Sequence, residues 1–228
     1  MWRAIILIIC GLILSPIGTG QGLTIAPILI EAQKHGGPNS LIIGSQLDRS
    51  LTVQVRAFRW DQINGQDELS PDPQLKLTPE IFRLEPGSQQ TVRMMVPDTG
   101  GLGAWRIIVD ELPSPQLPQQ AKQPAQLNIR IRYVLPMFSY PAGDISDLQM
   151  AKQNGHADLL NKGDGYLRLG NLALETAFGN TLPLSPSIAY VLPGAKHRVR
   201  LDESTSPIRQ IAFTLNNATH QLDLADRQ

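Results

Sequence analysis

The stretch that decides the fold is Leu127-Asn128-Ile129-Arg130-Ile131-Arg132-Tyr133-Val134-Leu135, residues 127–135. Apolar side chains stand at every second position, and two arginines lie between them. This period of two predicts a β-strand with one apolar face and one face that carries two guanidinium groups. The pattern alone favours an ordinary half-buried strand of a β-sandwich. The alternative is a strand that offers its edge to another chain, because a run rich in proline and glutamine, 114–126, precedes it.

The composition bounds the class of protein. A length of 228 residues suits one large β domain or two domains of about 100 residues each. Aromatic residues are only 5% of the chain, so aliphatic side chains must fill the cores. The 18 prolines and 19 glycines argue for many turns and against long helices. The 20 basic and 20 acidic residues cancel, which gives no sign of a nucleic-acid partner or an anionic membrane surface.

Residues 1–20 are predicted to form a secretory signal peptide. Arg3 supplies a positive charge, 4–14 is an apolar run too short to span a bilayer comfortably, and Gly18 and Gly20 suit cleavage before Gln21. A retained membrane anchor is the alternative, and we expect no stable membrane insertion after cleavage. Cys10 is the only cysteine and lies inside this segment, so the mature chain is expected to lack thiols and disulfides.

From residue 23 onward, strand-like runs alternate with turn signals. In the first half the expected strands are 23–31, 40–45, 51–60, 75–78, 81–84, 90–96, 105–112 and 127–135. Asn64-Gly65 is the strongest turn signal, and Pro27 marks the first run as an edge strand. The pattern restarts after 136–141, with strands expected at 158–160, 166–174, 188–192, 199–201, 208–215 and 221–224. This predicts an all-β chain of two immunoglobulin-like β-sandwich domains, 21–137 and 138–228.

Signatures of catalysis or metal binding are missing from the sequence. The four histidines have no zinc-ligand spacing and are expected to be lone surface residues: His35, His156, His197 and His220. No Gly-x-Ser-x-Gly elbow occurs. Gly100-Gly101-Leu102-Gly103 precedes a strand rather than a helix, so it is interpreted as a flexible hairpin loop and not as a phosphate loop.

The carboxylates do not suggest an acid–base pair either. Those of the first half are expected in polar loops, at Asp61, Asp67, Glu68 and Asp72. We therefore expect no enzyme, no bound metal and no cofactor.

Several runs share one order and spacing with a known family. They are VQVRAFRW at 53–60, TPEIFRLEPGSQQTVR at 78–93, WR at 105–106, DELP at 110–113, LPMF at 135–138, NKG at 161–163 and YVLPG at 190–194. Together these runs resemble the periplasmic chaperones of chaperone–usher pilus assembly, the PapD-like family, most closely its archaic branch. The resemblance implies two sandwiches at an angle with a cleft between them.

The resemblance also implies site residues. A pilin is similar to a sandwich that lacks one strand, and Leu127, Ile129 and Ile131 would fill its groove from alternate positions. Arg132 matches the family's basic residue for the pilin's terminal carboxylate, with Arg130 as the fallback. Arg93 is weighed as a cleft residue or as a structural ion-pair partner, and the second role is favoured.

Two positions depart from the family pattern. Ile28 and Leu29 stand where the better-known branch carries a carboxylate-binding arginine, so a second anchor for the carboxylate is missing. Leu102-Gly103-Ala104 stands where many members have a glutamate, which puts the usual interdomain ion network in doubt.

The leading hypothesis is a periplasmic chaperone without catalytic activity that binds pilin subunits and delivers them to an outer-membrane usher. A secreted two-domain adhesion or structural module is the alternative. A secreted hydrolase with a site built from loops is the third hypothesis, which the missing nucleophile–base signature disfavours.

Overall fold

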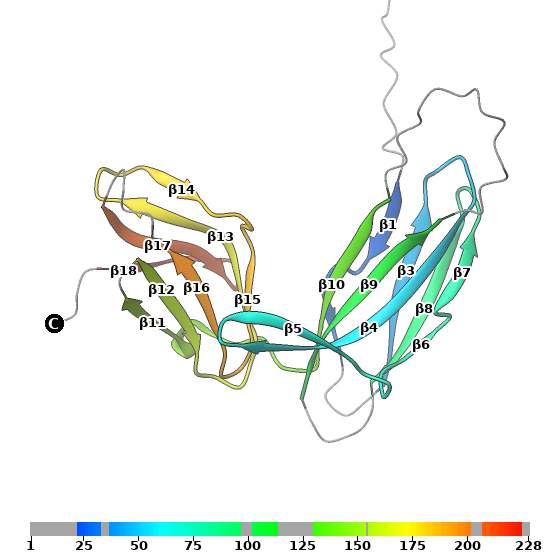
Figure 1. The fold of residues 1–228 in the computed structure, drawn as a ribbon, viewed down its shortest axis with the longest axis horizontal. Coiled ribbons are helices and arrows are strands. Elements are labelled where there is room, and N and C mark those ends of the chain that lie inside the picture. Colours follow the sequence, from blue (N-terminus) through cyan, green and yellow to red (C-terminus); the bar gives the residue numbers. More distant parts are fainter. Residues whose placement is uncertain are drawn as a thin grey trace, which may run out of the picture.

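The computed structural model describes residues 22–32, 37–96, 102–113, 130–153, 155–201 and 207–224. Within these ranges the chain folds into two β-sandwiches, and the only helix is a single 3₁₀ turn, η1 (Ile145–Asp147). Figure 1 shows the two sandwiches side by side at an angle, joined near the start of the second one. The prediction of an all-β chain with two immunoglobulin-like sandwiches is confirmed.

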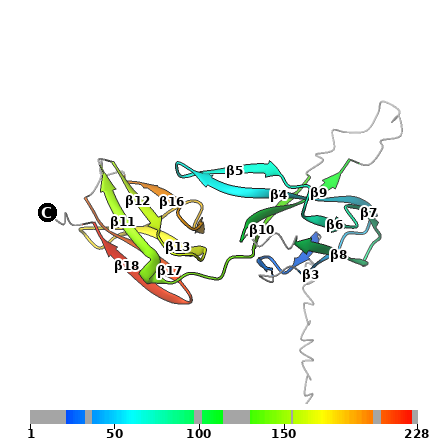
Figure 2. The same cartoon turned by 90° about the horizontal axis from the view of Figure 1, so that it is seen from below.

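The first sandwich has two sheets, which appear as two layers in Figure 2. One sheet has the order β1 (Leu23–Ala26), β3 (Gly37–Ser45), β8 (Gln89–Val96), β6 (Lys76–Thr78). The other has the order β2 (Ile30–Glu31), β10 (Arg132–Phe138), β9 (Ala104–Leu112), β4 (Leu51–Ile63), β5 (Gln66–Pro71), and β7 (Ile81–Leu84) also pairs with β4.

Alternation along the strands builds the core of the first sandwich. In β4, Leu51, Val53 and Val55 are buried, and the residues between them are only half-buried. In β8, Val92, Met94 and Val96 follow the same rule. Period-two burial of this kind places one face of each sheet in the core and the other in solvent. Aliphatic residues dominate this core, as the low aromatic content predicts.

The first predicted strand is split between the two sheets. β1 ends at Ala26 and pairs with β3, whereas β2 begins at Ile30 and pairs in parallel with the end of β10. Pro27 lies between them, where its missing N–H breaks no ladder. Both pieces are edge strands, which confirms the prediction drawn from Pro27.

The second sandwich also has two sheets. One has the order β11 (Leu148–Gln153), β12 (His156–Asn161), β16 (Lys196–Arg200). The other has the order β14 (Thr181–Pro183), β13 (Leu167–Thr176), β17 (Ile208–Leu215), β18 (Ala218–Asp223), and β15 (Ala189–Val191) also pairs with β13. Leucines and isoleucines again fill the core, with Phe213 as its aromatic member.

Asn64-Gly65 forms the predicted hairpin turn. Both residues have positive φ, 56° and 81°, as a tight two-residue turn requires, and Ile63 pairs with Gln66 across it. The strand after this turn, β5, is exposed at every position. The expectation that Asp61, Asp67 and Glu68 lie in polar loops is therefore wrong, because all three belong to the strands of this hairpin. β11 and β14 are also strands that the sequence did not indicate.

All three described histidines differ from the expected surface position. His156, His197 and His220 are half-buried, and burial lowers the pKa of His197. The strands of His156 and His197, β12 and β16, pair with each other. His35 lies outside the described residues. Over the described ranges, no group of three His, Cys, Asp or Glu side chains is arranged to hold a metal ion. Nor does any helix there have the length and apolarity needed to cross a membrane.

Candidate functional site

The predicted donor strand contains a sheet edge that the described strands leave open. β10 pairs with β9 along its whole length, from Arg132 opposite Asp110 to Phe138 opposite Ala104. On the other side, the only described strand that pairs with it is β2, at Met137 and Phe138 alone. We call the outer side of residues 132–136 the open edge of β10. Backbone groups along such an edge are a template for pairing with a further strand.

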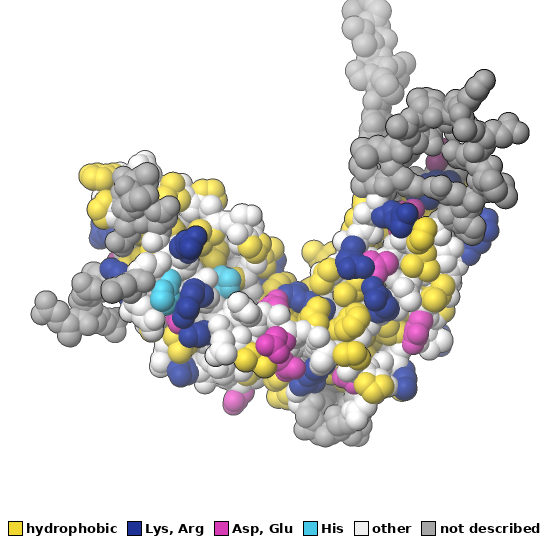
Figure 3. Space-filling view, viewed as in Figure 1, with side chains coloured by type: hydrophobic (Ala, Val, Ile, Leu, Met, Phe, Trp, Pro, Cys, Tyr) yellow, Lys and Arg dark blue, Asp and Glu magenta, His cyan; other side chains and the backbone are white. Residues whose placement is uncertain are grey.

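The open edge lies beside a notch between the sandwiches. Figure 1 shows β10 on the side of the first sandwich that faces the second one. The space-filling view in Figure 3 shows that the molecule is hollowed between the two sandwiches at the top of the view. A partner strand added to β10 would therefore enter at this notch.

The first half of β10 alternates as predicted, whereas its last four residues, 135–138, are all buried. Leu135 and Met137 are buried in the core of the first sandwich, and Tyr133 packs against it. Val134 is 47% exposed and Ile131 is 49% exposed, although both side chains are large and apolar. Ile131 is described outside any strand, directly before β10. Exposed apolar groups next to an unpaired backbone mark a surface suited to a protein partner.

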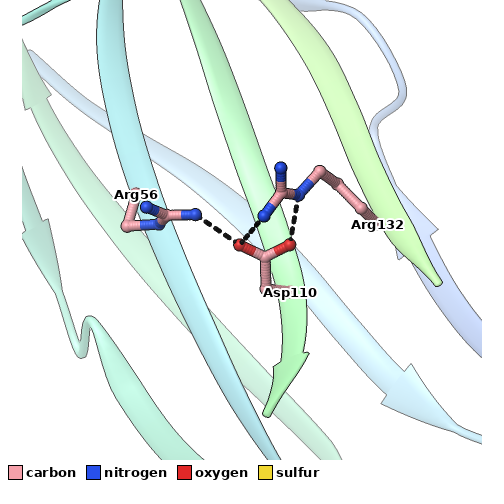
Figure 4. A network of polar contacts seen from close by, with 3 residues as sticks. All are labelled: Arg56, Asp110 and Arg132. Carbon is pink, nitrogen blue, oxygen red and sulfur yellow. Dashed lines mark hydrogen bonds and ion pairs between the residues drawn. The ribbon is translucent and has the colours of Figure 1, made fainter. Parts of the chain in front are cut away.

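Arg132 forms an ion pair within the first sandwich. Its Nε lies 2.6 Å from Asp110 Oδ1 and its Nη2 lies 3.3 Å from Asp110 Oδ2. Arg56 approaches the same carboxylate from β4, with its Nη2 at 2.6 Å from Oδ2. Figure 4 shows Asp110 between the two guanidinium groups. Two cations share one carboxylate, so the cluster keeps a net positive charge.

This arrangement sets the charge state of Asp110. Burial alone would raise the pKa of Asp110, but hydrogen bonds from Arg132 and Arg56 outweigh it and hold the pKa below its ordinary value. The bond to Asp110 in turn raises the pKa of Arg132. Asp110 is 12% exposed and Arg132 is 60% exposed, so the guanidinium remains accessible from solvent while the carboxylate does not.

The other predicted site residues are placed less directly. Leu127 and Ile129 lie outside the described residues. Arg130 is exposed and comes two residues before β10 begins. Arg93 lies on the outer face of β8, in the opposite sheet, and no ion pair of Arg93 occurs among the residues that the structure describes. Neither of the two roles weighed for Arg93 gains support from this position.

The two departures from the family pattern have different surroundings. Ile28 is 72% exposed in the bend between β1 and β2, whereas Leu29 packs against the cluster between the sandwiches. Gly103 is buried, and a Cβ there would overlap the Arg59 guanidinium and lie 2.8 Å from a ring carbon of Trp105. A larger residue at position 103 therefore does not fit this arrangement.

Aromatic side chains form the joint between the sandwiches. Phe138, at the end of β10, stacks on Tyr166 of the second sandwich with ring centroids 3.9 Å apart. The ring centroids of Trp60, on β4, and Tyr190 are 5.9 Å apart, and the two rings meet edge to face. The Tyr166 hydroxyl donates to Glu31 Oε1 at 2.7 Å. Aromatic pairs of this kind stabilise by about 0.5–1.5 kcal/mol beyond their buried area.

Sequence reasoning missed three residues of this region. Asp110 and Arg56 were quoted only as parts of runs, because their pairing with Arg132 depends on strand register. Gln62, which contacts the second sandwich, was not singled out at all. The turn signal at Asn64-Gly65 indicated the hairpin that carries Gln62, but not where that hairpin points.

The open edge and the aromatic joint define a class of two-sandwich proteins in which one strand leaves an outer edge open beside the interdomain notch. Residues 22–144 match the family described as "Pili and flagellar-assembly chaperone, PapD N-terminal domain". This match covers more than half of the chain, and the chain belongs to this family. Membership agrees with the expectation of a chaperone for pilus assembly. No curated protein matches the chain.

Solved structures share the fold at low sequence identity. A chain of the CsuC–CsuE chaperone–tip subunit complex from the archaic Csu pili of Acinetobacter baumannii superposes with a TM-score of 0.60 at 20% identity, over 80% of this chain and 91% of that chain. A chain of the Salmonella enterica SafA pilin–SafB chaperone complex gives 0.65 at 16% identity, over 90% and 97%. The E. coli chaperone DraB gives 0.62 at 17% identity, over 90% and 97%.

Proposed function

We propose that this chain is a periplasmic chaperone that caps pilin subunits by adding a strand to them along β10 and then delivers them to an outer-membrane usher. The observation that carries the proposal is the open edge of β10, flanked by the exposed side chains of Ile131 and Val134. The chain's membership of the pili chaperone family supports this choice over an adhesion module.

Backbone pairing accounts for capture without a fixed partner sequence. A sandwich that lacks one strand exposes core and unpaired backbone groups, and both are costly in water. An added strand supplies ladder hydrogen bonds to any partner sequence, while alternate side chains fill the groove. Strand addition at β10 therefore suits a family of related subunits.

Leu127, Ile129 and Ile131 would supply the groove-filling side chains. They share one parity along the chain, so in an extended strand they point to one face. Burial of each aliphatic side chain contributes about 1.5–3 kcal/mol. Three such contacts make a substantial contribution after the cost of ordering the segment is subtracted.

Arg132 is our candidate for binding the pilin's terminal carboxylate, with Arg130 as the fallback. Asp110 engages Nε and Nη2 of Arg132, and no described group engages its Nη1. A second carboxylate at Nη1 would meet a guanidinium whose position Asp110 already fixes, which lowers the ordering cost of the contact. Arg56 and Arg132 share the single carboxylate of Asp110, so one net positive charge remains to attract the pilin's terminal carboxylate.

The remaining parts of the proposal concern export and boundaries. We propose residues 1–20 as the signal peptide, 21–137 as the domain with the donor strand and 138–228 as the second sandwich. The proposed signal lies outside the described residues. Cleavage before Gln21 would release the chain into the periplasm, where the family acts.

Co-purification tests the proposal. The chaperone, wild type or Ile129→Asp/Ile131→Asp, is expressed with the pilin that co-purifies from a periplasmic extract, and soluble complex is measured. We expect the double variant to lose the complex, because two carboxylates cannot enter an apolar groove without a large desolvation cost. Ile81→Asp is the matched control, since Ile81 is similarly exposed on β7, away from the open edge. An undiminished yield with the double variant would exclude strand donation from this segment.

A further inference from the structure

The β4–β5 hairpin reaches from the first sandwich onto the second. Figures 1 and 2 both show its tip beside β16 of the second sandwich. Gly65 in the turn lies so close that a Cβ there would be 3.6 Å from the backbone oxygen of Lys196. Contacts from this hairpin therefore help to determine how the two sandwiches are oriented.

Gln62 makes the polar part of this contact. Its Nε2 donates to the backbone oxygen of Tyr190 at 2.9 Å, and its Oε1 accepts from the backbone N–H of Leu192 at 2.9 Å. One side-chain amide thus satisfies the donor and the acceptor on either side of Val191, as a neighbouring strand would. An amide is the side-chain group that offers a donor and an acceptor in this fork.

The amide is also held from its own side. Its Nε2 donates to Asp67 Oδ1 at 2.9 Å, and Asp67 binds Arg106, whose guanidinium carbon lies 3.5 Å from the centre of the Trp60 ring. These contacts restrict the rotamer of Gln62 before it meets the second sandwich. A polar contact fixed in this way imposes one geometry on its partner.

A second contact completes the constraint. The chain crosses between sandwiches next to Phe138, which stacks on Tyr166. The Trp60–Tyr190 contact and the Tyr166–Glu31 hydrogen bond support the same joint. Gln62 on β4 engages β15 and the residue that follows it, apart from the crossing segment, and so adds a directional backbone contact that the rings do not supply.

We propose that Gln62 is a positioning residue: its two bonds to Tyr190 and Leu192 hold the second sandwich at one angle to β10 and so preset the notch in which the pilin binds. The second half of this statement rests on the proposed function. A notch set before binding avoids the cost of ordering two domains during capture. Loss of the bonds is therefore expected to weaken capture about tenfold.

Distances between spin labels test the angle directly. Cys10 is the only cysteine and lies in the proposed signal peptide, so in the mature chain Thr91→Cys on β8 and Thr219→Cys on β18 give one label on each sandwich. Gln62→Met keeps the length of the side chain and removes both bonds. We expect a narrow distance distribution in the wild type and loss of the narrow peak in Gln62→Met. Gln66→Met, the same replacement across the turn on an exposed side chain, should stay narrow.

Gln62→Glu adds a pH-dependent control, because a variant that had simply failed to fold would not regain its narrow peak in mild acid. At neutral pH the carboxylate accepts from Leu192 but faces both the Tyr190 oxygen and the Asp67 carboxylate, so the narrow peak should be lost. The groups around it are Asp67 on β5, Arg106 on β9, Tyr190 on β15 and His197 on β16. Protonation in mild acid restores a donor, and the narrow peak should return, while the wild-type distribution stays unchanged between the two pH values.

The two claims fail separately. A narrow peak in both Gln62→Met and Gln62→Glu at neutral pH would overturn the positioning role. A broadened peak with pilin capture equal to wild type would overturn its contribution to capture. If the wild-type protein captures no pilin, the proposed function fails, and the distance result for the free protein still stands.

Discussion

Arg132 and Asp110 stand opposite each other in the β9–β10 ladder and are joined by two hydrogen bonds, of 2.6 and 3.3 Å. The first charged residue of the open edge is thus tied to the neighbouring strand. This tie fixes the guanidinium at the end of β10, about 20 Å along the strand from the aromatic joint at Phe138.

Asp110→Asn should destabilise the first sandwich by about 1–2 kcal/mol, because it leaves Arg56 and Arg132 close together without their shared carboxylate. Urea unfolding at neutral pH measures the change. Glu85→Gln removes the carboxylate of a pair whose side chains are 70% and 58% exposed, and should change stability much less, because solvent screens such a pair. Equal effects of the two substitutions would show that the cluster at Asp110 is no more stabilising than a surface pair.

Arg132→Gln should weaken pilin binding more than Arg130→Gln if Arg132 is the anchor for the terminal carboxylate. Glutamine retains hydrogen-bonding groups but loses the charge and the fork geometry. Titration with wild-type pilin and with a pilin whose terminal carboxylate is amidated separates the two arginines. An identical loss with both pilins would indicate a general charge effect, and a larger loss from Arg130→Gln would reverse the assignment.

Asp158 should make the second sandwich less stable at acidic pH. Its side chain is 3% exposed, and Arg198 and Lys196 bind it at 2.7–2.9 Å. Hydrogen bonds from Arg198 and then Lys196, against the opposing effect of burial, hold the pKa of Asp158 well below its usual value. Because the folded pKa is lowered, this contribution is complete above the unfolded value of about 3.9 and is lost as the pH falls below it.

Asp158→Asn measures that contribution. At pH 6 the variant should be less stable by about 3 kcal/mol, since two cations lose a buried partner. The gap between wild type and variant should shrink as the pH falls below about 4. A gap that is independent of pH over this range would mean that Asp158 is not preferentially ionised in the folded state.

Tyr166 should make the joint between the two sandwiches less stable at alkaline pH. Burial, together with the hydrogen bond to Glu31, raises the pKa of Tyr166 above its ordinary value. A raised pKa means a contribution that is complete below the unfolded value of about 10 and is lost as the pH rises through the folded value. Tyr166→Phe keeps the stack on Phe138 and should cost about 1 kcal/mol at pH 7, measured by thermal unfolding. If the variant lost as much stability as wild type above pH 10, ionisation would have to occur elsewhere.

The sequence predicted those parts of the fold that leave a local trace. The alternation in β4 identified the strand and its inward face correctly, and that of the predicted strand at 127–135 agrees with β10 over 132–135, because burial on one face imposes a period of two. Asn64-Gly65 identified its hairpin, since few residue pairs adopt two positive φ angles. By contrast, β5 and β14 are exposed at every position, so no apolar period marks them, and pairing with neighbouring strands defines them.

The candidate site was less predictable for a related reason. Arg132 and Asp110 are 22 residues apart, and only the register of β9 and β10 brings them together. Gln62 and Leu192 are 130 residues apart and belong to different sandwiches. Periodicity reports which face of its own strand a residue occupies, and not which residue stands opposite it.

Amide hydrogen exchange along β10 tests the central claim most directly. The amides of Tyr133 to Leu135 are followed in the free chaperone and in its complex with the co-purifying pilin. Strand addition predicts that the amides that point outward from the open edge exchange rapidly in the free protein and become strongly protected in the complex, with little change at β3 and β8 of the opposite sheet. Unchanged exchange along β10 in a verified complex, or new protection confined to another edge such as β7 or β14, would contradict it.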